Sequence, residues 1–522
     1  MPKASQELFI TREYSGFSLD LRNSEKHLQQ LPKLAQTFAA VHAQMQCIEA
    51  GDIKNPDEGR QVTHFGDRAV YASSELFADV EAFFAAVRSG ELLLNGKRVS
   101  AVVINGIGGS ALGPQLAQFA LRGPYWNELS AEQRDGNPKL YILDNTDPAG
   151  IHDLCAVADW STTLVITISK SGGTREPRNN MFALQAIYER AGLNFAAHAG
   201  AVTMAGSALD QHAETNGWRK RWHMAESIGG RTSETAVVGH VPAAAAGIDF
   251  GQLLEGAVLM DEWTRDPDPY TNPSYLLAAS WYLLGDGRGD RNMVVLPYSD
   301  RLVLLARYLQ QLVMESVGKG TDLRGVPVEQ GLNVFGNKGG SDAHAFVQQL
   351  QEGRDDFFVT FVEVLEDPAH YNAEQGLSMA DYLHNFLGGL VDALASKNRP
   401  VMTITIEALT PAALGMLIAL FERAVAAYAE LVQVNAFHQP GVQAYKLASG
   451  DMDALAQALQ KHVAANAGSE GPAAEIAAGL GAAQAVEGVL AKWAVNGRSF
   501  GGVTVSRSFD NGTWIYAFRG GS

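Results

Sequence analysis

The sequence has few cysteines, no excess of positive charge and no long apolar stretch. Only two of its 522 residues are cysteines, Cys47 and Cys155. Two cysteines cannot build a disulfide scaffold, so a cytoplasmic location is expected. The 40 lysines and arginines stand against 57 aspartates and glutamates, which gives a formal charge of −17. Such a chain is not expected to bind nucleic acid, because that requires cations that neutralise phosphates. The negative charge does not exclude a small anionic ligand, because hydrogen-bond donors close to the binding site are enough to hold it.

Membrane-spanning and secretory segments are not expected either. The longest predominantly apolar stretch covers residues 409–421, whereas a spanning helix needs about 20 such residues. We therefore expect a buried helix there. The first residues, MPKASQELF, contain no apolar core of a secretory signal. With 46% apolar and 19% charged residues, the composition is that of a globular protein.

Strands alternate with helices through most of the chain. Short apolar runs rich in β-branched residues predict strands at 101–106, 139–147, 162–174, 201–206, 291–299, 355–366 and 400–409. Helical periodicity between them, as at 302–320, predicts parallel βαβ units. We expect an α/β fold with two doubly wound lobes, 61–245 and 246–448, each with a parallel central sheet.

The two ends of the chain are expected to be extensions of these lobes. Polar and apolar residues mix at helical spacing in residues 1–60, which predicts a helical N-terminal extension. Residues 449–522 predict a helical segment followed by a β-hairpin. The hairpin is indicated by Asn511-Gly512, which lies between two β-type runs.

Two glycine-rich turns follow predicted strands of the first lobe. GIGGS, residues 106–110, lies before a helix, where glycine permits close backbone approach and the helix N-terminus offers free N–H groups. SKSGGT, residues 169–174, gathers three hydroxyls, an ammonium and two glycines, which suits a phosphate. A structural turn and a dinucleotide site are alternatives for the first turn, and a helix-capping loop is the alternative for the second.

Two further segments place charged groups beside glycine or on a helix. SIGGRTS, residues 227–233, sets Arg231 after two glycines, where a guanidinium can reach an anionic intermediate. In QLVMESVGK, residues 311–319, Gln311 and Glu315 are four apart and share one helix face. Glu315 is therefore a candidate general base. A solvated turn and a solvated helix end are the alternatives.

Two segments offer groups for proton transfer. GGSDAH ends at His344, and histidine is a residue type that can move protons near pH 7. HQPGVQAYK contains Gln439 at a Pro-Gly turn and Lys446 about two helical turns later. Taken alone, each of these residues fits a structural role equally well.

Together and in this order, the segments resemble the glucose-6-phosphate isomerase (phosphoglucose isomerase) family of bacterial type. The matching blocks are GIGGSALGP, SKSGGT, GGRTS, ESVGKG and QPGVQAYK, spread over residues 105–446. The resemblance implies two sugar-isomerase (SIS) α/β/α domains and a homodimer. It also implies interconversion of glucose 6-phosphate and fructose 6-phosphate through a cis-enediol(ate), in glycolysis and gluconeogenesis, without metal or organic cofactor.

The resemblance also implies roles for individual residues. Glu315 would move a proton between C2 and C1, and Arg231 would stabilise the enediolate. His344, contributed by the partner subunit, and Lys446 would act in ring opening. The implied substrate-binding residues are Ser110, Ser169, Lys170, Ser171, Thr174, Gly230, Gln311 and Gln439.

Three other functions are compatible with parts of this pattern. An isomerase of another phosphosugar, such as mannose 6-phosphate, would share the base and the phosphate turn. A non-catalytic sugar-phosphate sensor would keep the turn and lose the acid–base groups, so Glu315, His344 and Lys446 argue against it. A dinucleotide enzyme would require an acid about 20 residues after the first turn, where the sequence has none ending a strand. No membrane or nucleic-acid partner is expected.

Overall fold

The computed structural model describes residues 7–12, 15–56 and 58–520. The chain divides into two compact units, residues 1–438 and 439–522. The predicted boundary between two lobes at residue 245 falls inside the first unit and stays a prediction. Each unit has its own hydrophobic core.

A five-stranded sheet in the first unit is parallel throughout, in the order β11-β10-β9-β7-β8. Its strands are β7 (Ala101–Asn105), β8 (Lys139–Leu143), β9 (Thr163–Ile168), β10 (Ala199–Thr203) and β11 (Lys220–His223). Val102 and Ile104 pack into one core, whereas Val103 between them packs into another. This alternation buries both faces of the sheet, as a parallel sheet requires.

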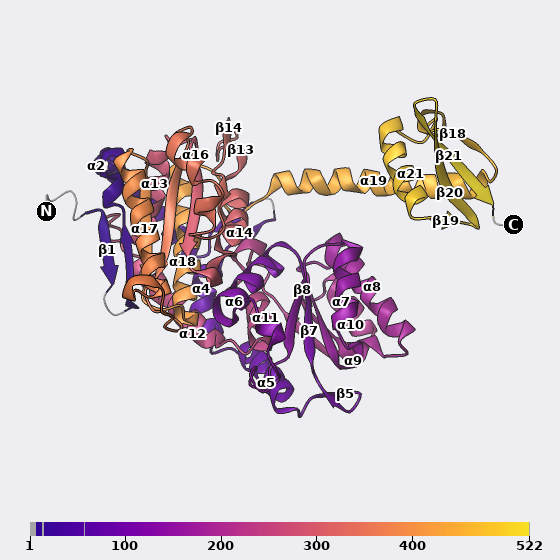
Figure 1. The fold of residues 1–522 in the computed structure, drawn as a ribbon, viewed down its shortest axis with the longest axis horizontal. Coiled ribbons are helices and arrows are strands. Elements are labelled where there is room, and N and C mark those ends of the chain that lie inside the picture. The colour runs from indigo at the N-terminus through magenta and orange to yellow at the C-terminus, as the bar shows by residue number, and fades with distance from the viewer. Residues whose placement is uncertain (1–6, 13–14, 57, 521–522) are drawn as a thin grey trace. The chain divides into compact units, whose positions relative to one another are not determined.

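Helices cover both faces of this sheet (Figure 1). One face is covered by α6 (Leu112–Arg122) and α11 (Val237–Ala245), and the other by α7 (Pro148–Val157), α8 (Arg175–Arg190), α9 (Phe195–His198) and α10 (Ala208–Thr215). The predicted doubly wound α/β arrangement is confirmed here. The carboxyl ends of β7 and β9 lead directly into GIGGS and SKSGGT, so both turns meet at one edge of the sheet.

A second, six-stranded sheet has the order β1-β2-β17-β16-β12-β15. The four strands β12 (Asn292–Tyr298), β15 (Val334–Phe335), β16 (Phe357–Val364) and β17 (Val401–Ile406) are parallel, and β1 (Phe9–Arg12) and β2 (Phe17–Asp20) add an antiparallel edge. The N-terminal segment, predicted to be helical, therefore contains two strands of this sheet before its helices. Phe17 and Leu19 are buried whereas Ser18 and Asp20 are not, which is strand periodicity over only four residues.

The remaining elements of the first unit connect and cover the sheets. The helices are α2 (Leu31–Leu34), α3 (Phe38–Glu49), α4 (His64–Tyr71), α5 (Glu75–Ser89), α12 (Phe250–Trp263), α13 (Pro273–Leu284), α16 (Val347–Glu352), α17 (Met379–Ser396) and α18 (Pro411–Leu431). Three small hairpins are formed by β3 (Ile53–Asn55) with β4 (Arg60–Gln61), β5 (Leu93–Leu94) with β6 (Lys97–Arg98), and β13 (Lys319–Thr321) with β14 (Pro327–Gln330).

Helix α18 is the buried helix that the apolar stretch predicts. Among the described residues it alone is long and apolar enough to cross a membrane, but 94% of its most apolar window is buried inside the protein. It packs against α12 and α13 in the main core. The apolar character of α18 therefore reflects its place in that core.

The single helix expected over residues 302–320 is broken. The structure has α14 (Leu305–Leu309), a π-helical turn (Gln310–Met314) and α15 (Glu315–Val317). A π turn inserts an extra residue into the helical path, and such turns are frequent at functional sites. The apolar periodicity of the segment hides this insertion.

The second unit combines helices with a four-stranded antiparallel sheet. Its elements are α19 (Pro440–Ala465), β18 (Glu470–Pro472), α20 (Ala473–Ile476), α21 (Ala483–Val495), β19 (Ser499–Phe500), β20 (Val503–Asp510) and β21 (Thr513–Gly520). The predicted hairpin is confirmed, with Asn511 and Gly512 both at positive φ, 49° and 82°. Positive φ at both positions is the signature of a type I′ turn.

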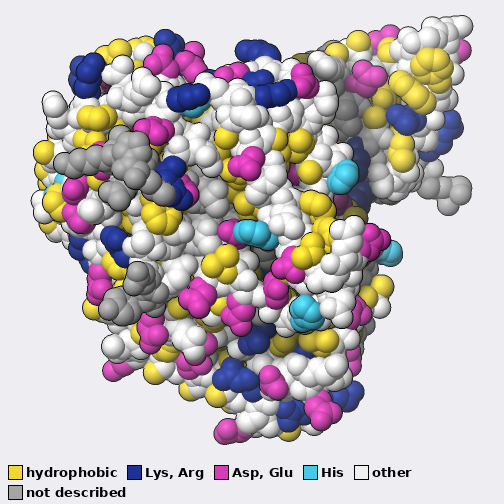
Figure 2. Space-filling view, turned by 60° about the vertical axis from the view of Figure 1, so that its left-hand side comes forward, with side chains coloured by type: hydrophobic (Ala, Val, Ile, Leu, Met, Phe, Trp, Pro, Cys, Tyr) yellow, Lys and Arg dark blue, Asp and Glu magenta, His cyan; other side chains and the backbone are white. Residues whose placement is uncertain are grey.

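The surface and the cysteines agree with the composition. Acidic, basic and apolar side chains are interspersed over the face shown in Figure 2. Cys47 is half-buried, Cys155 is exposed, and both are free thiols.

Candidate active site

The GIGGS loop packs directly against two other predicted site segments. A Cβ added to Gly109 would lie 1.7 Å from the carbonyl oxygen of Gly230, so only glycine allows this approach. Gly108 has a φ of +59°, and a Cβ there would lie 2.9 Å from Nε2 of Gln311. Ser110 ends the same loop, in the 3-10 turn Gly108–Ser110. The loop after β7 therefore joins the Arg231 segment to the Glu315 segment.

The SKSGGT turn is folded tightly at the N-terminus of α8. Oγ of Ser169 accepts a hydrogen bond from the amide of Gly172 at 3.2 Å, and Oγ of Ser171 accepts one from Gly173 at 3.1 Å. Gly172 has a φ of +73°, and a Cβ there would lie 2.3 Å from the backbone nitrogen of Leu209. Thr174 occupies the N-cap of the 16-residue helix. The free amides of the first turn of α8 favour an anion beside this turn.

Lys170 links the phosphate turn to the loop that carries Arg231. Its ammonium donates to the carbonyl oxygens of Glu226 at 2.5 Å and of Ile228 at 3.2 Å. Burial and, to a lesser extent, the charge of Arg60 together lower the pKa of Lys170 to about 8. Since the acceptors are neutral carbonyls, the positive charge of Lys170 is not cancelled by them.

Arg231 is buried and fully engaged. Nε donates to Oγ of Ser316 at 2.8 Å, and Nη1 donates to Oε2 of Glu315 at 3.5 Å. Nη2 donates to the carbonyl oxygens of Ala436 and His438. Burial lowers the pKa of Arg231, and the carboxylate of Glu315 opposes that effect. The guanidinium is therefore fixed beside the carboxylate of the candidate base.

Glu315 has one occupied and one open carboxylate oxygen. Oε2 accepts from Nε2 of Gln311 at 3.3 Å as well as from Arg231, so Gln311 and Glu315 meet as their spacing predicts. Oε1 accepts no hydrogen bond from any residue that the structure describes. The side chain is 29% exposed. A carboxylate held through one oxygen, with the other open, is suited to take up a proton.

Lys319 is a residue of this site whose position the sequence did not indicate. Its ammonium donates to the carbonyl oxygens of Glu315 at 2.6 Å and of Ser316 at 2.8 Å, and the residue is 4% exposed. Burial lowers its pKa to about 7, and the charge of Arg231 contributes in the same direction. The only signal was the preceding Gly318, which turns the chain back over the end of α15.

One predicted residue of the first unit, His344, is not brought into this arrangement. His344 is exposed, and its side chain makes no hydrogen bond within the described parts of the chain. The 3-10 turn that carries it is anchored by buried Asp342, whose Oδ2 accepts from the amide of Asn337 at 2.7 Å. Gln439, at the N-cap of α19, and Lys446, exposed on that helix, belong to the second unit.

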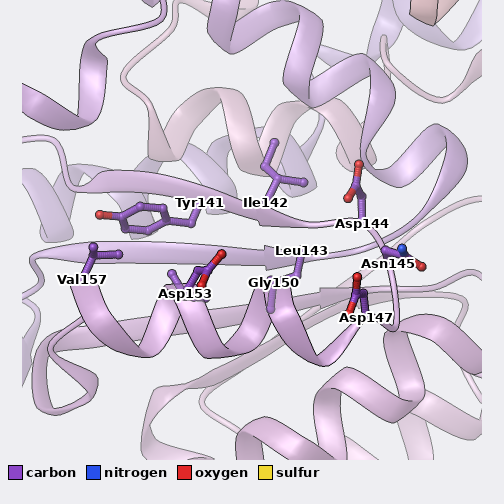
Figure 3. Close-up of a pocket in the computed structure, with 10 residues that line it drawn as sticks. Tyr141, Ile142, Leu143, Asp144, Asn145, Asp147, Gly150, Asp153 and Val157 are labelled. Carbon is purple, nitrogen blue, oxygen red and sulfur yellow. The ribbon is translucent and has the colours of Figure 1, made fainter. Parts of the chain in front are cut away.

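One cavity lies outside the predicted site. It has a volume of ≈ 380 Å³ and lies between strand β8 and helix α7 (Figure 3), with Tyr141 and Asp144 on one side and Asp153 on the other. It contains none of the predicted site residues. Among the described residues, no group of three or more His, Cys, Asp or Glu side chains is placed to hold a metal ion.

The converging segments are those that carry the family resemblance. The sequence model described as phosphoglucose isomerase matches residues 16–397 and 390–469. The chain belongs to this family. The match includes every predicted site segment and continues into α19.

Individual relatives agree with this assignment. A glucose-6-phosphate isomerase of Thermosynechococcus vestitus is 48% identical over 443 residues, which cover 82% of this chain and 82% of that protein. Its counterpart from Rippkaea orientalis is 43% identical over 522 residues, which cover 97% of this chain and 96% of that protein. The crystal structure of a glucose-6-phosphate isomerase from Chlamydia trachomatis aligns with a TM-score of 0.75 and 26% identity, over 86% of this chain and 90% of that chain.

Proposed function

We propose that this protein interconverts glucose 6-phosphate and fructose 6-phosphate through a cis-enediolate. The observation that carries the proposal is the pair formed by Glu315 and Arg231, 3.5 Å apart, on segments that Lys170 and the GIGGS loop tie together. The isomerase names of relatives at 43% and 48% identity support the same reaction. No finding favours a different phosphosugar or a sensor.

Glu315 is the base in this proposal. Oε1 takes the proton from C2 of the open-chain aldose and returns it to C1, and the reverse reaction uses the same oxygen. One carboxylate reaches both carbons because they are adjacent. Gln311 and Arg231 hold Oε2, so the open oxygen keeps its direction during the transfer. The guanidinium of Arg231 stabilises the negative charge that develops on the enediolate oxygens.

The phosphate is bound at the SKSGGT turn. The free amides at the start of α8, the hydroxyls of Ser169, Ser171 and Thr174, and the ammonium of Lys170 supply donors for a dianion. Ser110 and Gly230 line the path from this turn to the base. The phosphate is remote from the reacting carbons, so its binding energy serves to orient the sugar.

We further propose that the active form is a homodimer in the cytoplasm, in which His344 of the partner subunit completes the site. The exposure of His344 is consistent with such a role. His344 and Lys446 then supply the acid and base of ring opening, and Gln439 contacts the sugar. The proposed domains are two SIS lobes, 61–245 and 246–448, flanked by the terminal segments 1–60 and 449–522.

The direct test is conversion of fructose 6-phosphate in the presence of EDTA, with glucose 6-phosphate measured by a coupled dehydrogenase. We expect rapid conversion that Glu315→Gln lowers by about 10²- to 10⁴-fold. The exposed Glu132→Gln is the matched control and keeps full activity. Conversion of mannose 6-phosphate at a higher kcat/KM, or substrate binding without any turnover, would contradict the proposal.

The shared site is tested by mixing two inactive variants. Glu315→Gln and His344→Ala subunits are mixed and allowed to exchange. If each site takes Glu315 and His344 from different subunits, activity returns to about a quarter of wild type, because half of random dimers are mixed and each has one intact site. Mixed dimers without activity would place both residues of a site in one subunit.

A further inference from the structure

The β3–β4 hairpin lies against the active-site loop although it contains none of the predicted site residues. Nη1 of Arg60 donates to the carbonyl oxygen of Ser227 at 3.2 Å, across 167 residues of sequence. Nη2 of the same guanidinium would lie 3.9 Å from a Cβ added to Gly229. The side chain of Arg60 is 10% exposed, and Nε donates to Oε2 of Glu58. Arg60 is therefore a largely buried cation of β4 that lies against the loop leading into Arg231.

The loop is held through three consecutive carbonyl groups. Lys170 donates to the carbonyl oxygens of Glu226 and Ile228. Arg60 donates to the carbonyl oxygen of Ser227, which lies between them. Residues 225–228 form a turn, in which the amide of Ile228 donates to the carbonyl oxygen of Ala225 at 3.4 Å. Lys170 and Arg60 together bind three successive carbonyls of this turn and hold its backbone more tightly than either cation alone.

The same pattern recurs on the other side of Arg231. Its Nη2 donates to the carbonyl oxygens of Ala436 and His438. The carbonyl between them, that of Phe437, accepts a hydrogen bond from Nδ2 of Asn55 at 3.1 Å. Asn55 is fully buried and its Oδ1 accepts from the amide of Glu58 at 3.3 Å. One hairpin thus holds the middle carbonyl of both segments that surround the guanidinium.

The two hairpin residues are coupled within the hairpin itself. Asn55 ends β3, Arg60 begins β4, and the two residues are paired across the strands. Glu58 lies between them and bonds to both side chains. A shift of either segment therefore moves the whole hairpin.

We infer that Arg60 is a positioning residue of the isomerase reaction, which acts through the loop 226–230 to hold Arg231 where the enediolate forms. Asn55 holds the segment 436–438 in the same way, through the carbonyl oxygen of Phe437. The inference rests on the proposed role of Arg231. Arg60 donates no described hydrogen bond to Glu315 or to the phosphate turn, and its charge disfavours the charged form of Lys170, so its removal is expected to slow the chemical step without weakening phosphate binding.

The test compares kcat, KM and two inhibitors in Arg60→Met and in Arg60→Lys. Small displacements of a catalytic group cost up to about 10²-fold in rate, so Arg60→Met should lower kcat about 10- to 100-fold while KM changes less than about 3-fold. A phosphorylated five-carbon hydroxamate, whose planar anion mimics the enediolate, should bind more weakly in proportion to kcat. Inorganic phosphate should bind as in wild type. Arg60→Lys keeps the charge and one donor, and should recover part of the loss.

The matched control is Arg22→Met. Arg22 also forms an ion pair with an acid two residues earlier, Asp20, but has no contact with a site segment, so kcat should stay within about 2-fold. Asn55→Leu provides an independent variant and should lower kcat with the same inhibitor pattern. If Arg60→Met does not fold, Arg60→Lys and Asn55→Leu decide the question.

Three results would overturn the inference. Unchanged kcat in the folded variants would remove any positioning role. Loss of phosphate affinity as large as the loss of hydroxamate affinity would make Arg60 a phosphate ligand. A lower melting temperature of the variants, with kcat and KM both unchanged, would show that Arg60 has only a structural role. By contrast, a wild-type protein that does not convert fructose 6-phosphate would refute the proposed function itself.

Discussion

The first unit contains two groups of buried charges, and they are built differently. In the core, Arg68 donates to both oxygens of Asp261 at 2.5 Å and to Oε2 of Glu422 at 2.6 Å. Arg423 also pairs with Asp261 and with Glu49. Cations and carboxylates are joined here by direct hydrogen bonds, which are bidentate between Arg68 and Asp261. Such pairing is what permits charges to be buried at all.

In the active site, buried cations outnumber carboxylates. Lys170 and Lys319 donate only to backbone carbonyls, and Arg231 contacts the single carboxylate of Glu315 at 3.5 Å. Carbonyl oxygens orient a cation without cancelling its charge. The difference teaches that every charge of the core network already has a partner of opposite sign in the free protein, whereas the site has fewer carboxylates than cations. A phosphate and an enediolate would supply further negative charge.

The largest effect is expected when the core network is broken. Arg68→Met leaves Asp261 and Glu422 without their main partner, which should cost about 3–5 kcal/mol of unfolding free energy. Urea unfolding measures this loss, and kcat per folded molecule should stay near wild type. Lys397→Met, which breaks the exposed pair with Glu352, is the control and should change stability by less than about 1 kcal/mol. A small loss in Arg68→Met would mean that the core charges are not matched as described.

For Arg231→Met we expect a large loss of kcat and a smaller loss of stability. Removing one group that stabilises a developing oxyanion costs about 10²- to 10³-fold in kcat, whereas stability should fall less than in Arg68→Met, because the Glu315 carboxylate that loses its partner is 29% exposed and those of Asp261 and Glu422 are buried. Steady-state kinetics and thermal unfolding of the same preparation separate the two effects. A strongly destabilised variant with little loss of kcat would show that Arg231 belongs with the core network.

A smaller effect, on binding alone, is expected for Lys170→Met. Loss of one charged hydrogen bond is worth about 1.5–3 kcal/mol, so KM for fructose 6-phosphate should rise about 10- to 100-fold with kcat less affected. Burial lowers the pKa of Lys170 to about 8, so the lysine is charged below that pH and neutral above it. KM of the wild type should therefore rise as pH passes through 8, and this rise should be missing in the variant. The same pH profile in both proteins would contradict the role of Lys170.

The sequence predicted seven strands of the two large sheets and the segments that meet around Glu315 and Arg231. Strand β7 was predicted within one residue, because a run of apolar β-branched residues ends at a glycine turn. The N-terminal strands were missed since Phe17 and Leu19 alternate over only four residues. The π turn before Glu315 was missed because one inserted residue does not disturb the apolar pattern.

The supporting residues of the site could not be predicted for a different reason. Lys319 lies at an apparent helix end, where a lysine is normally solvated, and only the turn at Gly318 carries it inward. Arg60 reaches Ser227 from 167 residues away, and nothing in its neighbourhood marks a functional residue. Local patterns show which segments bear chemical groups, whereas the contacts that orient those groups depend on tertiary packing.

The most subtle effect concerns Glu234, three residues after Arg231 and next to the core network. Both of its oxygens are buried without a hydrogen-bond partner among the described residues, and Oε2 lies against Gly113, where a Cβ would be 2.1 Å away. Burial raises the pKa of Glu234 well above its usual range, and the charge of Glu422 adds to this. The folded protein therefore keeps Glu234 protonated at pH values where the unfolded chain has ionised it.

The sign of the resulting pH dependence follows from linkage. Above about pH 4.5 the folded state binds more protons at this position than the unfolded state, so its contribution to stability falls as pH rises, by up to about 1.4 kcal/mol per pH unit. Glu234→Gln is neutral in both states and should lack this slope. The difference in unfolding free energy between variant and wild type should therefore grow from pH 5 to pH 8, in favour of the variant. Parallel stability curves would mean that Glu234 is ionised in the folded protein, and that the core, like the site, tolerates an unmatched charge.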